Sequence, residues 1–413
     1  MKIAIISNLY PPLIRGGAEI VAALQAEALK KNWQHVFVIS SRPQYVRSPG
    51  AGLWSRDFSS VTQDEVNEVL VYRFRPFNLY YYLDDYRYPA PWRLLWHLLD
   101  IFNFFSYFQV KKILKKEQPD LVITHNLMGL GFLIPRLLRK LNLKHIHVLH
   151  DLQLITPSGL VIKGREDAWQ HKFFRALGYV RLMRKLWGSP AAVLSPSRFL
   201  LDYYSRQGFF PLSKKIVLPN PITNLISVKK IPSYNLEILY LGQVNRAKGL
   251  LDLIKSFRDL KISAARLHIV GLGQDLNQAK SLARGDKRIR FYGWLQRQAL
   301  APLLAKMDVL VLPSLCYENS PTVIYEALSM GLPVLTSDIG GAAELIKEGY
   351  NGWVFPAGDF QALNNKLSTL YQQRDKLPLL AENCRQSIRP CHIDNYVIKL
   401  LEIINNHAQV VAP

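Results

Sequence analysis

The sequence predicts an α/β protein with two doubly wound parallel-sheet domains that face each other across a cleft. Short apolar segments alternate with longer amphipathic segments, an order that is typical of parallel sheets covered by helices on both faces. The alternation begins at Lys2 and starts a second time at Leu236. Between the two series lie Leu218–Pro221 and a polar stretch that ends at Pro232, and we place the domain boundary there.

The first domain is expected to span residues 1–222. Its strands are expected in short apolar runs at Lys2–Ser7, His35–Ser40, Val69–Phe74, Asp120–Thr124 and His145–His150. Its helices are expected in longer amphipathic segments at 18–31, 97–117, 129–141, 169–187 and 197–207. Because parallel strands need such crossover segments between them, this order predicts a parallel sheet.

The second domain is expected to span residues 223–390. Its strands are expected at 236–241, 265–270, 288–292, 308–312 and 332–336, with helices between them and further helical segments after Phe360. Residues 391–413 are expected to form a C-terminal helix that packs back on the first domain. Ligands of doubly wound sheets bind beyond the carboxyl ends of the strands, so the cleft between the two domains is the predicted site.

Length and composition exclude several protein classes. The 413 residues are 49% hydrophobic, which is enough for two or three ordinary cores. Three cysteines without a C-x-x-C pair argue against a disulfide scaffold and against a zinc site. The segment Met1–Asn8 leaves no room for a signal peptide, and Leu94–Val110 is interrupted by polar residues and is too short for a transmembrane helix. We therefore expect a cytoplasmic protein.

The formal charge of +21 is concentrated in the first half of the chain. Residues 1–225 contain 30 basic and 15 acidic side chains, a net charge of +15, whereas residues 226–413 contain 22 and 16, a net charge of +6. Nucleic acid, an anionic membrane and a phosphorylated substrate all fit this distribution. The sequence has no recognition helix, zinc finger or RNP motif, so a nucleic-acid partner is not expected.

The strongest chemical signal is the pair Glu318 and Glu326, which are separated by seven residues. A helix is expected to start at Ser320 or Pro321, because serine caps helices well and proline suits the first helical position. The two carboxylates would then lie roughly 10 Å apart, which is wide for a glycosidase pair at about 5–10 Å. Binding two hydroxyl groups of one extended ligand fits better, with a diphosphate at the free N–H groups of Asn319–Thr322. A surface helix with two solvated glutamates is the alternative.

Two turns are further candidates for phosphate binding. Lys248 follows the predicted strand 236–241, where it could neutralise a phosphate or be a solvated loop lysine. Arg15, Gly16 and Gly17 precede the first helix, and two glycines let the backbone approach a ligand closely. This turn is neither G-x-G-x-x-G nor a Walker loop, so dinucleotide and ATP sites of those kinds are disfavoured.

Two weaker signals complete the set. His150 ends a predicted central strand and would therefore point into the cleft, although a single histidine is often structural. Gly271 and Gly273 form half of a nucleotide fingerprint that lacks the third glycine, so they indicate a tight turn beside a phosphate rather than a dehydrogenase. Neither signal identifies a function alone.

Taken together, these segments resemble the retaining GT-B glycosyltransferases of family four. The resemblance rests on Glu318–Glu326, Gly331–Val334 and Ser337–Glu344, and it covers essentially the whole chain. The other matching segments, in the order of the family, are Gly16–Glu19, His150–Asp151, Ser195–Ser197, Pro219–Pro221, Lys248–Gly249, Gly271 with Gly273, Pro313–Ser314, Asn351–Gly352 and Gly358–Asp359. Each segment is weak alone, but their common order is highly specific.

The resemblance implies two Rossmann-like domains, a nucleotide-sugar donor held mainly by the second domain, and an acceptor held mainly by the first. By this resemblance, Glu326 would bind the ribose, and Glu318 and His150 would contact the donor sugar. Lys248 would bind the diphosphate, with Gly16 and Gly17 beside it. The segment Tyr292–Trp294 would border the nucleobase. Glu318, His150 and Lys248 are thus the expected catalytic residues. The family generally needs no metal, so no cofactor is expected.

Gln243 departs from the pattern of the family. Many relatives carry an arginine at this point, and some branches carry glutamine. Arg15 or Arg246 could supply the missing positive charge beside the diphosphate. The sequence alone leaves this choice open.

The resemblance also implies retention by front-face attack, in which the leaving diphosphate takes the proton of the acceptor. No motif places a carboxylate to attack the sugar, and Lys248 and helix N-termini would stabilise the departing charge. The alternatives are a nucleotide-sugar epimerase and a non-catalytic nucleotide-sugar-binding subunit. The two spaced glutamates argue against the epimerase, and the intact candidate residues argue against the binding subunit.

The expected acceptor is a polysaccharide or glycolipid precursor, and the first domain is expected to dock on the cytoplasmic face of an anionic membrane. Aromatic residues are dense at 80–82 and 92–108, and the segment 171–187 interleaves basic with apolar residues. A basic amphipathic helix of this kind lies in the headgroup region of a membrane. The alternative is that these aromatic residues simply cover the first sheet.

Overall fold

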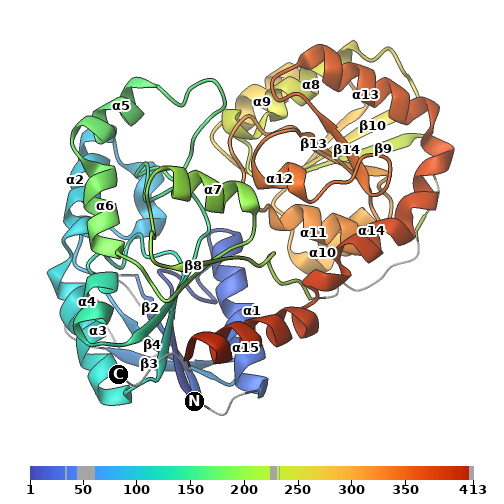
Figure 1. Ribbon diagram of the computed structural model, residues 1–413. Helices are drawn as coiled ribbons and strands as arrows, with labels where there is room; N and C mark the ends of the chain where they lie inside the picture. The colour runs from blue at the N-terminus through green and yellow to red at the C-terminus, as the bar shows by residue number, and fades with distance from the viewer. Residues whose placement is uncertain (33–34, 44–60, 224–229, 232, 409–413) are drawn as a thin grey trace, which may run out of the picture.

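The computed structural model describes residues 1–32, 35–43, 61–223, 230–231 and 233–408. It confirms the predicted α/β class, with two domains that are each built on a largely parallel sheet (Figure 1). The residues 224–229 and Pro232, which belong to the predicted linker, lie outside the described ranges.

Within the described residues, the first sheet has eight strands in the order β3-β4-β2-β1-β5-β6-β7-β8, and every neighbouring pair is parallel except β3 with β4. The strands are β1 (Lys2–Ile6), β2 (His35–Ser41), β3 (Thr62–Val66), β4 (Val69–Phe74), β5 (Leu121–Thr124), β6 (Lys144–Val148), β7 (Ala192–Ser195) and β8 (Lys214–Val217). Ile3 to Ile6 in the central strand β1 are fully buried, as expected for a sheet that is covered on both faces.

Helices of the first domain pack on both faces of this sheet. They are α1 (Gly17–Asn32), η1 (a 3-10 helix, Tyr82–Arg87), α2 (Ala90–Ile101), α3 (Phe104–Glu117), α4 (Ile134–Lys140), α5 (Trp169–Ala176), α6 (Tyr179–Trp187) and α7 (Arg198–Arg206). On one face, α2, α3, α4, α6 and α7 bury a core that includes Trp96, Leu137 and Trp187. On the other face, α1 packs beside the C-terminal helix α15 (Ile393–Ala408).

The second sheet has six strands among the described residues, all parallel, in the order β11-β10-β9-β12-β13-β14. The strands are β9 (Leu236–Leu241), β10 (Ala265–Val270), β11 (Ile289–Gly293), β12 (Val309–Leu312), β13 (Val334–Ser337) and β14 (Gly352–Phe355). The helices are η2 (Arg246–Lys248), α8 (Leu250–Asp259), α9 (Leu276–Leu282), α10 (Arg297–Leu304), α11 (Thr322–Ser329), α12 (Gly340–Glu344), α13 (Phe360–Gln372), η3 (Arg374–Leu380), α14 (Ala381–Ile388) and η4 (Arg389–Cys391). One core joins the sheet to α8, α9 and α13, and another joins it to α10, α11 and α14.

The C-terminal helix α15 returns from the second domain and lies beside α1 (Figure 1). Tyr396, Val397, Leu400 and Ile404 recur on one helical face and are buried in the core of the first domain. The chain therefore crosses between the domains twice. The two crossings meet at Ile222, whose N–H donates to the carbonyl oxygen of Cys391 and whose carbonyl oxygen accepts from Ile393 N–H, each at 2.9 Å.

Three predicted helices are shorter than the sequence suggested, because the chain turns inside them. The segment 97–117 breaks before α3, whose N-terminus is capped by the Asn103 side chain as it accepts a hydrogen bond from Ser106 N–H at 2.9 Å. The segment 169–187 breaks at Gly178, which has φ of +74°. The segment 129–141 becomes helical only at Ile134, because Gly129 and Gly131 both adopt positive φ. The sequence prediction also missed β3, β7, β8 and β14.

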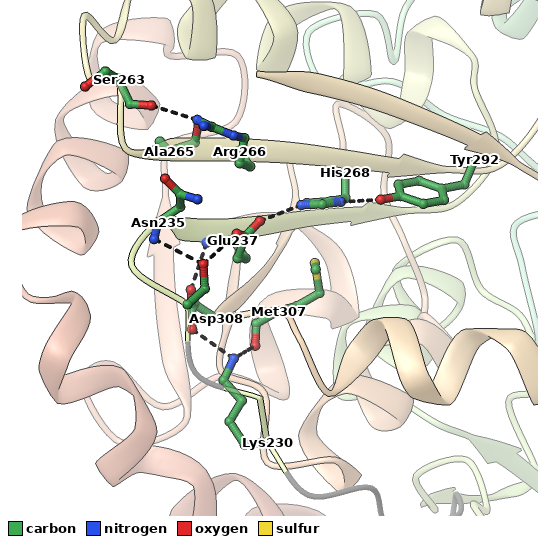
Figure 2. A network of polar contacts seen from close by, with 11 residues as sticks. Lys230, Asn235, Glu237, Ser263, Ala265, Arg266, His268, Tyr292, Met307 and Asp308 are labelled. Atoms are coloured by element: carbon green, nitrogen blue, oxygen red, sulfur yellow. Dashed lines mark hydrogen bonds and ion pairs between the residues drawn. The ribbon is translucent and has the colours of Figure 1, made fainter. Parts of the chain in front are cut away.

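A polar network crosses the second sheet at the point where the chain enters this domain (Figure 2). The Asp308 carboxylate accepts hydrogen bonds from Lys230 Nζ and from Glu237 N–H, each at 2.8 Å. The Glu237 carboxylate lies 2.6 Å from His268 Nε2, and His268 Nδ1 lies 2.8 Å from the hydroxyl of Tyr292. These contacts tie β9, β10 and β11 to Lys230 in the predicted linker.

Asp100 should make the folded protein less stable as the pH rises. Its side chain is almost fully buried on α2, and burial raises its pKa to about 8 against the opposing hydrogen bond from Gly129 N–H. The unfolded chain loses this proton near pH 4, so between about pH 4 and pH 8 only the folded state holds it. Stability should therefore fall across this interval, by about 1.4 kcal/mol per pH unit from this group.

Asp100→Asn should remove that contribution. We expect the thermal midpoint of the variant to fall less steeply than that of the wild type between pH 6 and pH 8, and the two curves to run parallel above about pH 8. Asp259→Asn is the matched control, because Asp259 is exposed at the end of α8. Equal slopes for wild type and Asp100→Asn would contradict the assignment.

Candidate active site

A cavity of about 380 Å³ lies between the two domains, and it gathers most of the predicted site residues. Those that line it are Arg15, Gly16, Gly17 and His150 from the first domain, and Gln243, Lys248, Glu318, Asn319, Ser320, Pro321 and Thr322 from the second. They follow the carboxyl ends of β1, β6, β9 and β12, where ligands of doubly wound sheets bind.

The predicted donor-binding residues that do not line this cavity are Arg246, Gly271, Trp294 and Glu326. Arg246 is exposed and lines a separate cavity of about 450 Å³, together with Lys163 and Arg165. Trp294 follows β11 with 66% of its surface exposed, and Glu326 is half-buried on the second turn of α11. The structure therefore separates the two arginines that the sequence left as alternatives.

Gly271 serves backbone packing rather than direct contact with the cavity. A Cβ atom at this position would lie 1.8 Å from the carbonyl oxygen of Gly242, and one at Gly273 would lie 2.1 Å from that of Val244. These distances are far below van der Waals contact, so the two glycines let the turn after β10 pack against the turn after β9. The turn after β9 leads to Lys248.

Local backbone geometry fixes the position of Lys248 at the end of η2. The Asn245 side chain accepts a hydrogen bond from Lys248 N–H at 3.2 Å. Gly249 follows with φ of +69°, and a Cβ atom there would lie 1.8 Å from the carbonyl oxygen of Pro313. Only glycine fits this contact, which brings the lysine against the segment that contains Glu318.

Lys248 Nζ lies 2.5 Å from Glu318 Oε1, so two of the predicted catalytic residues form an ion pair. Ser314 Oγ donates a hydrogen bond to the same carboxylate oxygen at 2.7 Å. Burial alone would lower the pKa of Lys248, but the negative charge of Glu318 and the hydrogen bond to it raise the pKa above its ordinary value. The lysine therefore remains a cation at neutral pH.

The loop that carries Glu318 rests on glycines of the following βα unit. Gly341 N–H donates a hydrogen bond to the Glu318 carbonyl oxygen at 2.7 Å. A Cβ atom at Gly340 would lie 2.3 Å from that oxygen, and one at Gly341 would lie 1.7 Å from the carbonyl oxygen of Asn319. Gly340 and Gly341, which lie within the matching segment Ser337–Glu344, thus hold the acidic loop in place.

Helix α11 begins at Thr322, with Pro321 as its N-cap, so the predicted start at Ser320 or Pro321 was one or two residues too early. The Ser320 hydroxyl pairs with the hydroxyl of Tyr325 at 2.6 Å instead of capping the helix. Because Thr322 and Val323 line the cavity, the N-terminus of α11 still lies at the candidate site.

Asn319 connects the acidic loop to the first domain. Its Oδ1 accepts a hydrogen bond from Ser197 Oγ at 2.6 Å, and its Nδ2 donates to the carbonyl oxygen of His150 at 3.0 Å. Asn220 adds a third link by donating to the carbonyl oxygen of Ser320 at 3.1 Å. The positions of Glu318 and His150 are therefore coupled through one amide side chain.

Glu344 makes a second connection between the domains. Its two carboxylate oxygens accept hydrogen bonds from the backbone N–H groups of Arg198 and Phe199, at 2.8 and 2.5 Å. These are the first residues of α7, where a carboxylate also stabilises the helix dipole. Farther along the interface, the Tyr317 hydroxyl donates to Glu166 at 2.6 Å.

The N-terminus of α1 forms the opposite wall of the cavity. Gly16 N–H donates a hydrogen bond to Glu19 Oε2 at 2.8 Å, and burial raises the pKa of Glu19. The Arg15 guanidinium lies over the ring of Tyr82, 4.6 Å from its centre. A Cβ atom at Gly17 would lie 2.8 Å from Cγ2 of Thr322, so the two domains touch at this glycine.

His150 does not end a strand, as the sequence suggested, because β6 stops at Val148. It lies in the loop beyond the strand and lines the cavity, and burial lowers its pKa to about 4, so the imidazole is neutral at pH 7. Its neighbour Asp151 accepts a hydrogen bond from Gln153 N–H at 2.8 Å, and burial raises the pKa of Asp151 to about 6. His150 Nε2 lies 2.9 Å from Nδ1 of His125.

Further cavity residues were missed as site residues. They are Glu19, Tyr82, Asn126, Asp151 and Asn220. Asn126 follows the end of β5 by two residues, so the strand-end rule could have found it. Tyr82 belongs to η1, which begins well after β4 ends at Phe74, and the sequence indicated it only as part of the aromatic run 80–82, not as a site residue.

Within the described residues, no group of three or more His, Cys, Asp or Glu side chains could hold a metal ion. None of the helices in the same part of the chain is long and apolar enough to cross a membrane. Cys316, Cys384 and Cys391 are buried and carry free thiols.

Comparison with known proteins gives two family matches that lie side by side along the chain. Residues 15–223 match the family described as Glycosyltransferase Family 4, and residues 235–373 match Glycosyl transferases group 1. An uncharacterised glycosyltransferase of Methanocaldococcus jannaschii is 27% identical over 380 residues, which cover 86% of this chain and 85% of that protein. The UDP-Gal:alpha-D-GlcNAc-diphosphoundecaprenol alpha-1,3-galactosyltransferase of Escherichia coli is 35% identical over 124 residues, which cover 29% of this chain and 31% of that protein.

The structure of the Anabaena protein HepE in complex with UDP resembles this one with a TM-score of 0.70 and 17% sequence identity, over 98% of this chain and 100% of that chain. At that identity the likeness shows the fold, which is GT-B: two facing α/β domains with a site between them. The Family 4 match by itself spans half of the sequence. The chain therefore belongs to Glycosyltransferase Family 4.

Proposed function

We propose that this glycosyltransferase moves a sugar from a nucleotide-sugar donor to an acceptor with retention of the anomeric configuration. The observation that supports this most is the Lys248–Glu318 ion pair, a largely buried cation on a cavity that the N-termini of α1 and α11 also line. A cation and two helix N-termini in one place suit a diphosphate. HepE was solved with UDP, which supports a UDP-sugar as the donor.

In this mechanism Lys248 stabilises the negative charge that develops on the leaving diphosphate. Arg15 supplies the positive charge that Gln243 lacks, because Arg15 lines the donor cavity whereas Arg246 lines a different one. The acceptor hydroxyl attacks the sugar from the face that the diphosphate leaves, and its proton passes to the diphosphate. Glu318 then has two tasks, to hold Lys248 through one oxygen and to contact the sugar through the other.

His150 and Glu326 complete the proposed donor site. His150 is neutral and lies at the cavity wall, so its ring can exchange a hydrogen bond with a sugar hydroxyl. Glu326 lies one turn into α11 and would bind the ribose, with Trp294 bordering the base. Since neither of these two residues lines the cavity, the nucleoside would extend from it towards α11 and β11.

A second cavity, of about 730 Å³, suits the acceptor. It lies in the first domain between α2 and α5, with Leu94, Leu160 and Phe173 among its apolar lining and Arg93 and Arg165 among its basic residues. The loop after β6 lines both cavities: His150 lies at the donor cavity, and Ile162 lies at this second cavity, the apolar groove. An amphiphilic acceptor with an anionic group, such as a lipid diphosphate-linked sugar, fits this lining, and the name of the E. coli relative supports the same class.

The aromatic segments of the first domain support a membrane-facing surface as part of this proposal. They divide into two sets: Trp96 and Trp187 are buried in the core, whereas Trp92, Phe104 and Phe108 remain more than half exposed on α2 and α3. Packing over the sheet therefore accounts for the buried aromatic residues but not for the exposed ones. Basic residues such as Lys112, Lys115 and Lys116 continue along the exposed side of α3, and an apolar face beside basic residues is typical of proteins that lie on anionic membranes.

Lys248→Ala should reduce turnover about a hundredfold or more, since the cation acts on charge that grows in the transition state. Turnover is measured as sugar transfer, or as slow hydrolysis of UDP-, GDP- and ADP-sugars, and NMR of the product reports its anomeric configuration. Lys280→Ala, an exposed lysine of α9, is the matched control. Lys248→Ala/Glu318→Gln should regain stability lost to the unpaired Glu318 carboxylate but not turnover. Near-native turnover in Lys248→Ala, or an inverted product, would contradict the proposal.

Gly17→Ala should weaken donor turnover by keeping the domains apart. The new methyl would meet Thr322 Cγ2 at 2.8 Å, whereas Thr322 Oγ1 lies at 3.5 Å. Thr322→Ser removes only Cγ2, the nearer of these two atoms. The double variant Gly17→Ala/Thr322→Ser should therefore recover most of the kcat/KM lost in Gly17→Ala, with a coupling energy of about 1 kcal/mol or more between the two substitutions. Additive losses would show that the site works without this contact.

Phe104→Ser/Phe108→Ser should reduce sedimentation with anionic liposomes, and so should Arg181→Ala/Arg184→Ala/Lys185→Ala on the exposed side of α6. Binding should require anionic lipid and decline with salt. Phe360→Ser serves as the matched control, because Phe360 is 42% exposed on α13 in the second domain. Equal recovery in the supernatant with neutral and anionic liposomes at low salt would rule out membrane docking.

A further inference from the structure

Arg246 does not line the donor cavity, and its own cavity of about 450 Å³ has no part in the mechanism above. Residues from both domains line this second basic space. The first domain contributes Lys163 and Arg165, and the second contributes Arg246 and Leu315. Three basic side chains around one cavity favour an anionic ligand.

The two guanidinium groups are the cations that a ligand could use. Lys163 Nζ is already paired with the carboxylate of Asp338 at 3.3 Å. Arg165 and Arg246 are both exposed, and within the described part of the chain neither makes an ion pair within 4.0 Å, although Asp252 also lines the cavity. Arginine binds phosphate oxygens through two parallel N–H groups, so two unpaired guanidinium groups suit a phosphate.

Backbone hydrogen bonds tie the two arginine-bearing loops to one segment of chain. Lys163 N–H donates to the carbonyl oxygen of Leu315 at 2.9 Å, and Leu315 N–H donates to the carbonyl oxygen of Ala247 at 2.8 Å. Arg165 lies two residues beyond the first contact, and Arg246 lies one residue before the second. The backbones that carry the two guanidinium groups are therefore held in place relative to each other without a ligand.

The cavity adjoins the apolar groove of the first domain, because Ile162 and Arg165 line both spaces. The groove of about 730 Å³ has apolar side chains such as Leu160 and Phe173 in its lining. A ligand that fills both spaces would have an anionic group at the arginines and an apolar chain in the groove. A free phosphate would leave the groove empty, so the continuity of the two spaces favours an amphiphile.

We propose that Arg165 and Arg246 form a phosphate subsite for the amphiphilic acceptor, whose phosphate or diphosphate binds between the two domains while its apolar chain lies in the groove. The acceptor then contacts both domains, so the second domain does more than hold the donor. The inference rests on the proposed function in one respect, which is that the ligand of the groove is the acceptor. The phosphate subsite itself depends only on the cavity and its charges.

The subsite and the donor cavity are formed by different residues of the same two segments. Arg246 and Leu315 line the subsite, whereas Lys248 and Glu318, two and three residues further along the chain, line the donor cavity. The donor diphosphate and the acceptor phosphate would thus each have their own cations. Removing an arginine of the subsite should therefore weaken the binding of only one of the two ligands.

Calorimetry with farnesyl diphosphate, a short amphiphile with a terminal diphosphate, tests the subsite without any transfer reaction. Arg165→Gln and Arg246→Gln should each weaken its binding about tenfold, the value of one charge-assisted hydrogen bond. Because the donor cavity could also accept a diphosphate, UDP is titrated into the same variants. Arg246→Gln should leave the affinity for UDP unchanged, whereas Lys248→Ala should weaken UDP and leave the affinity for farnesyl diphosphate unchanged.

Arg284→Gln is the matched control, because Arg284 is an exposed arginine of the second domain that does not line either cavity. It should bind both ligands as the wild type does. The side chains of Arg165 and Arg246 are exposed, so all three variants should also unfold at the wild-type thermal midpoint when no ligand is present.

Two further ligands distinguish an amphiphile from a free anion. Farnesol lacks the diphosphate and inorganic pyrophosphate lacks the chain, so both should bind at least about tenfold more weakly than farnesyl diphosphate. Leu160→Ser, which changes a residue of the groove that is 40% exposed, should weaken the binding of farnesyl diphosphate but not that of pyrophosphate.

Wild-type affinity for farnesyl diphosphate in both arginine variants would overturn the subsite. A loss of UDP affinity in Arg246→Gln would do the same, because it would assign this arginine to the donor. Pyrophosphate that binds as tightly as farnesyl diphosphate would overturn the amphiphilic ligand. Failure of the proposed function would look different: farnesyl diphosphate would still bind through both arginines, but the protein would neither bind UDP nor hydrolyse any nucleotide-sugar.

Discussion

The hydrogen bonds of Asn319 hold the site together, because this residue belongs to the acidic loop of the second domain and binds the first. Its amide accepts from Ser197 and donates to the carbonyl oxygen of His150. The same loop is fixed from behind by Gly340 and Gly341, whose backbone approaches it more closely than any Cβ atom would allow. The distance between Glu318 and His150 is therefore set by packing within the second domain and by the amides of Asn319 and Asn220 across the cleft.

The electrostatics of the cavity follow from this enclosure. Lys248 stays charged because Glu318 is 2.5 Å away, whereas burial keeps His150 neutral and raises the pKa of Asp151 to about 6. Two cations, Lys248 and Arg15, thus line the cavity, and they would stabilise the proposed diphosphate as its negative charge increases during the reaction. The family membership and the geometry point to the same kind of chemistry, group transfer from an activated sugar.

In the first domain, the donor cavity, the apolar groove and the domain interface all use residues from one short stretch of chain. The loop after β6 lines the donor cavity at His150 and the apolar groove at Ile162, and the groove opens beside α2, where Trp92 is exposed. Lys163 and Tyr317, which flank the bridge between Ile162 and Cys316, also bind across the interface. A proposed acceptor site next to a proposed membrane face would let an amphiphilic acceptor reach the donor without leaving the surface of the bilayer.

The sequence alone determined the properties that depend on local patterns. The alternation of strands and helices can be read from the period and the length of the apolar segments. The α/β class, the strand 236–241 and the positions of Lys248 and Glu318 beyond strand ends could therefore all be predicted. Helix ends were less certain: the breaks at Asn103 and Gly178 depend on a side-chain cap and on a positive φ that amphipathic periodicity does not record.

Only the tertiary structure decided which distant residues meet. Lys248 and Glu318 are 70 residues apart, and Gln25 and Tyr396 are 371 apart, so their contacts depend on how the elements pack and not on any local pattern. The same holds for Arg15 and Arg246, which the sequence left as alternatives and which line different cavities, and for Gly271, whose backbone lies close to that of Gly242. Such contacts follow from shape and burial in three dimensions, where residues that no pattern relates become neighbours.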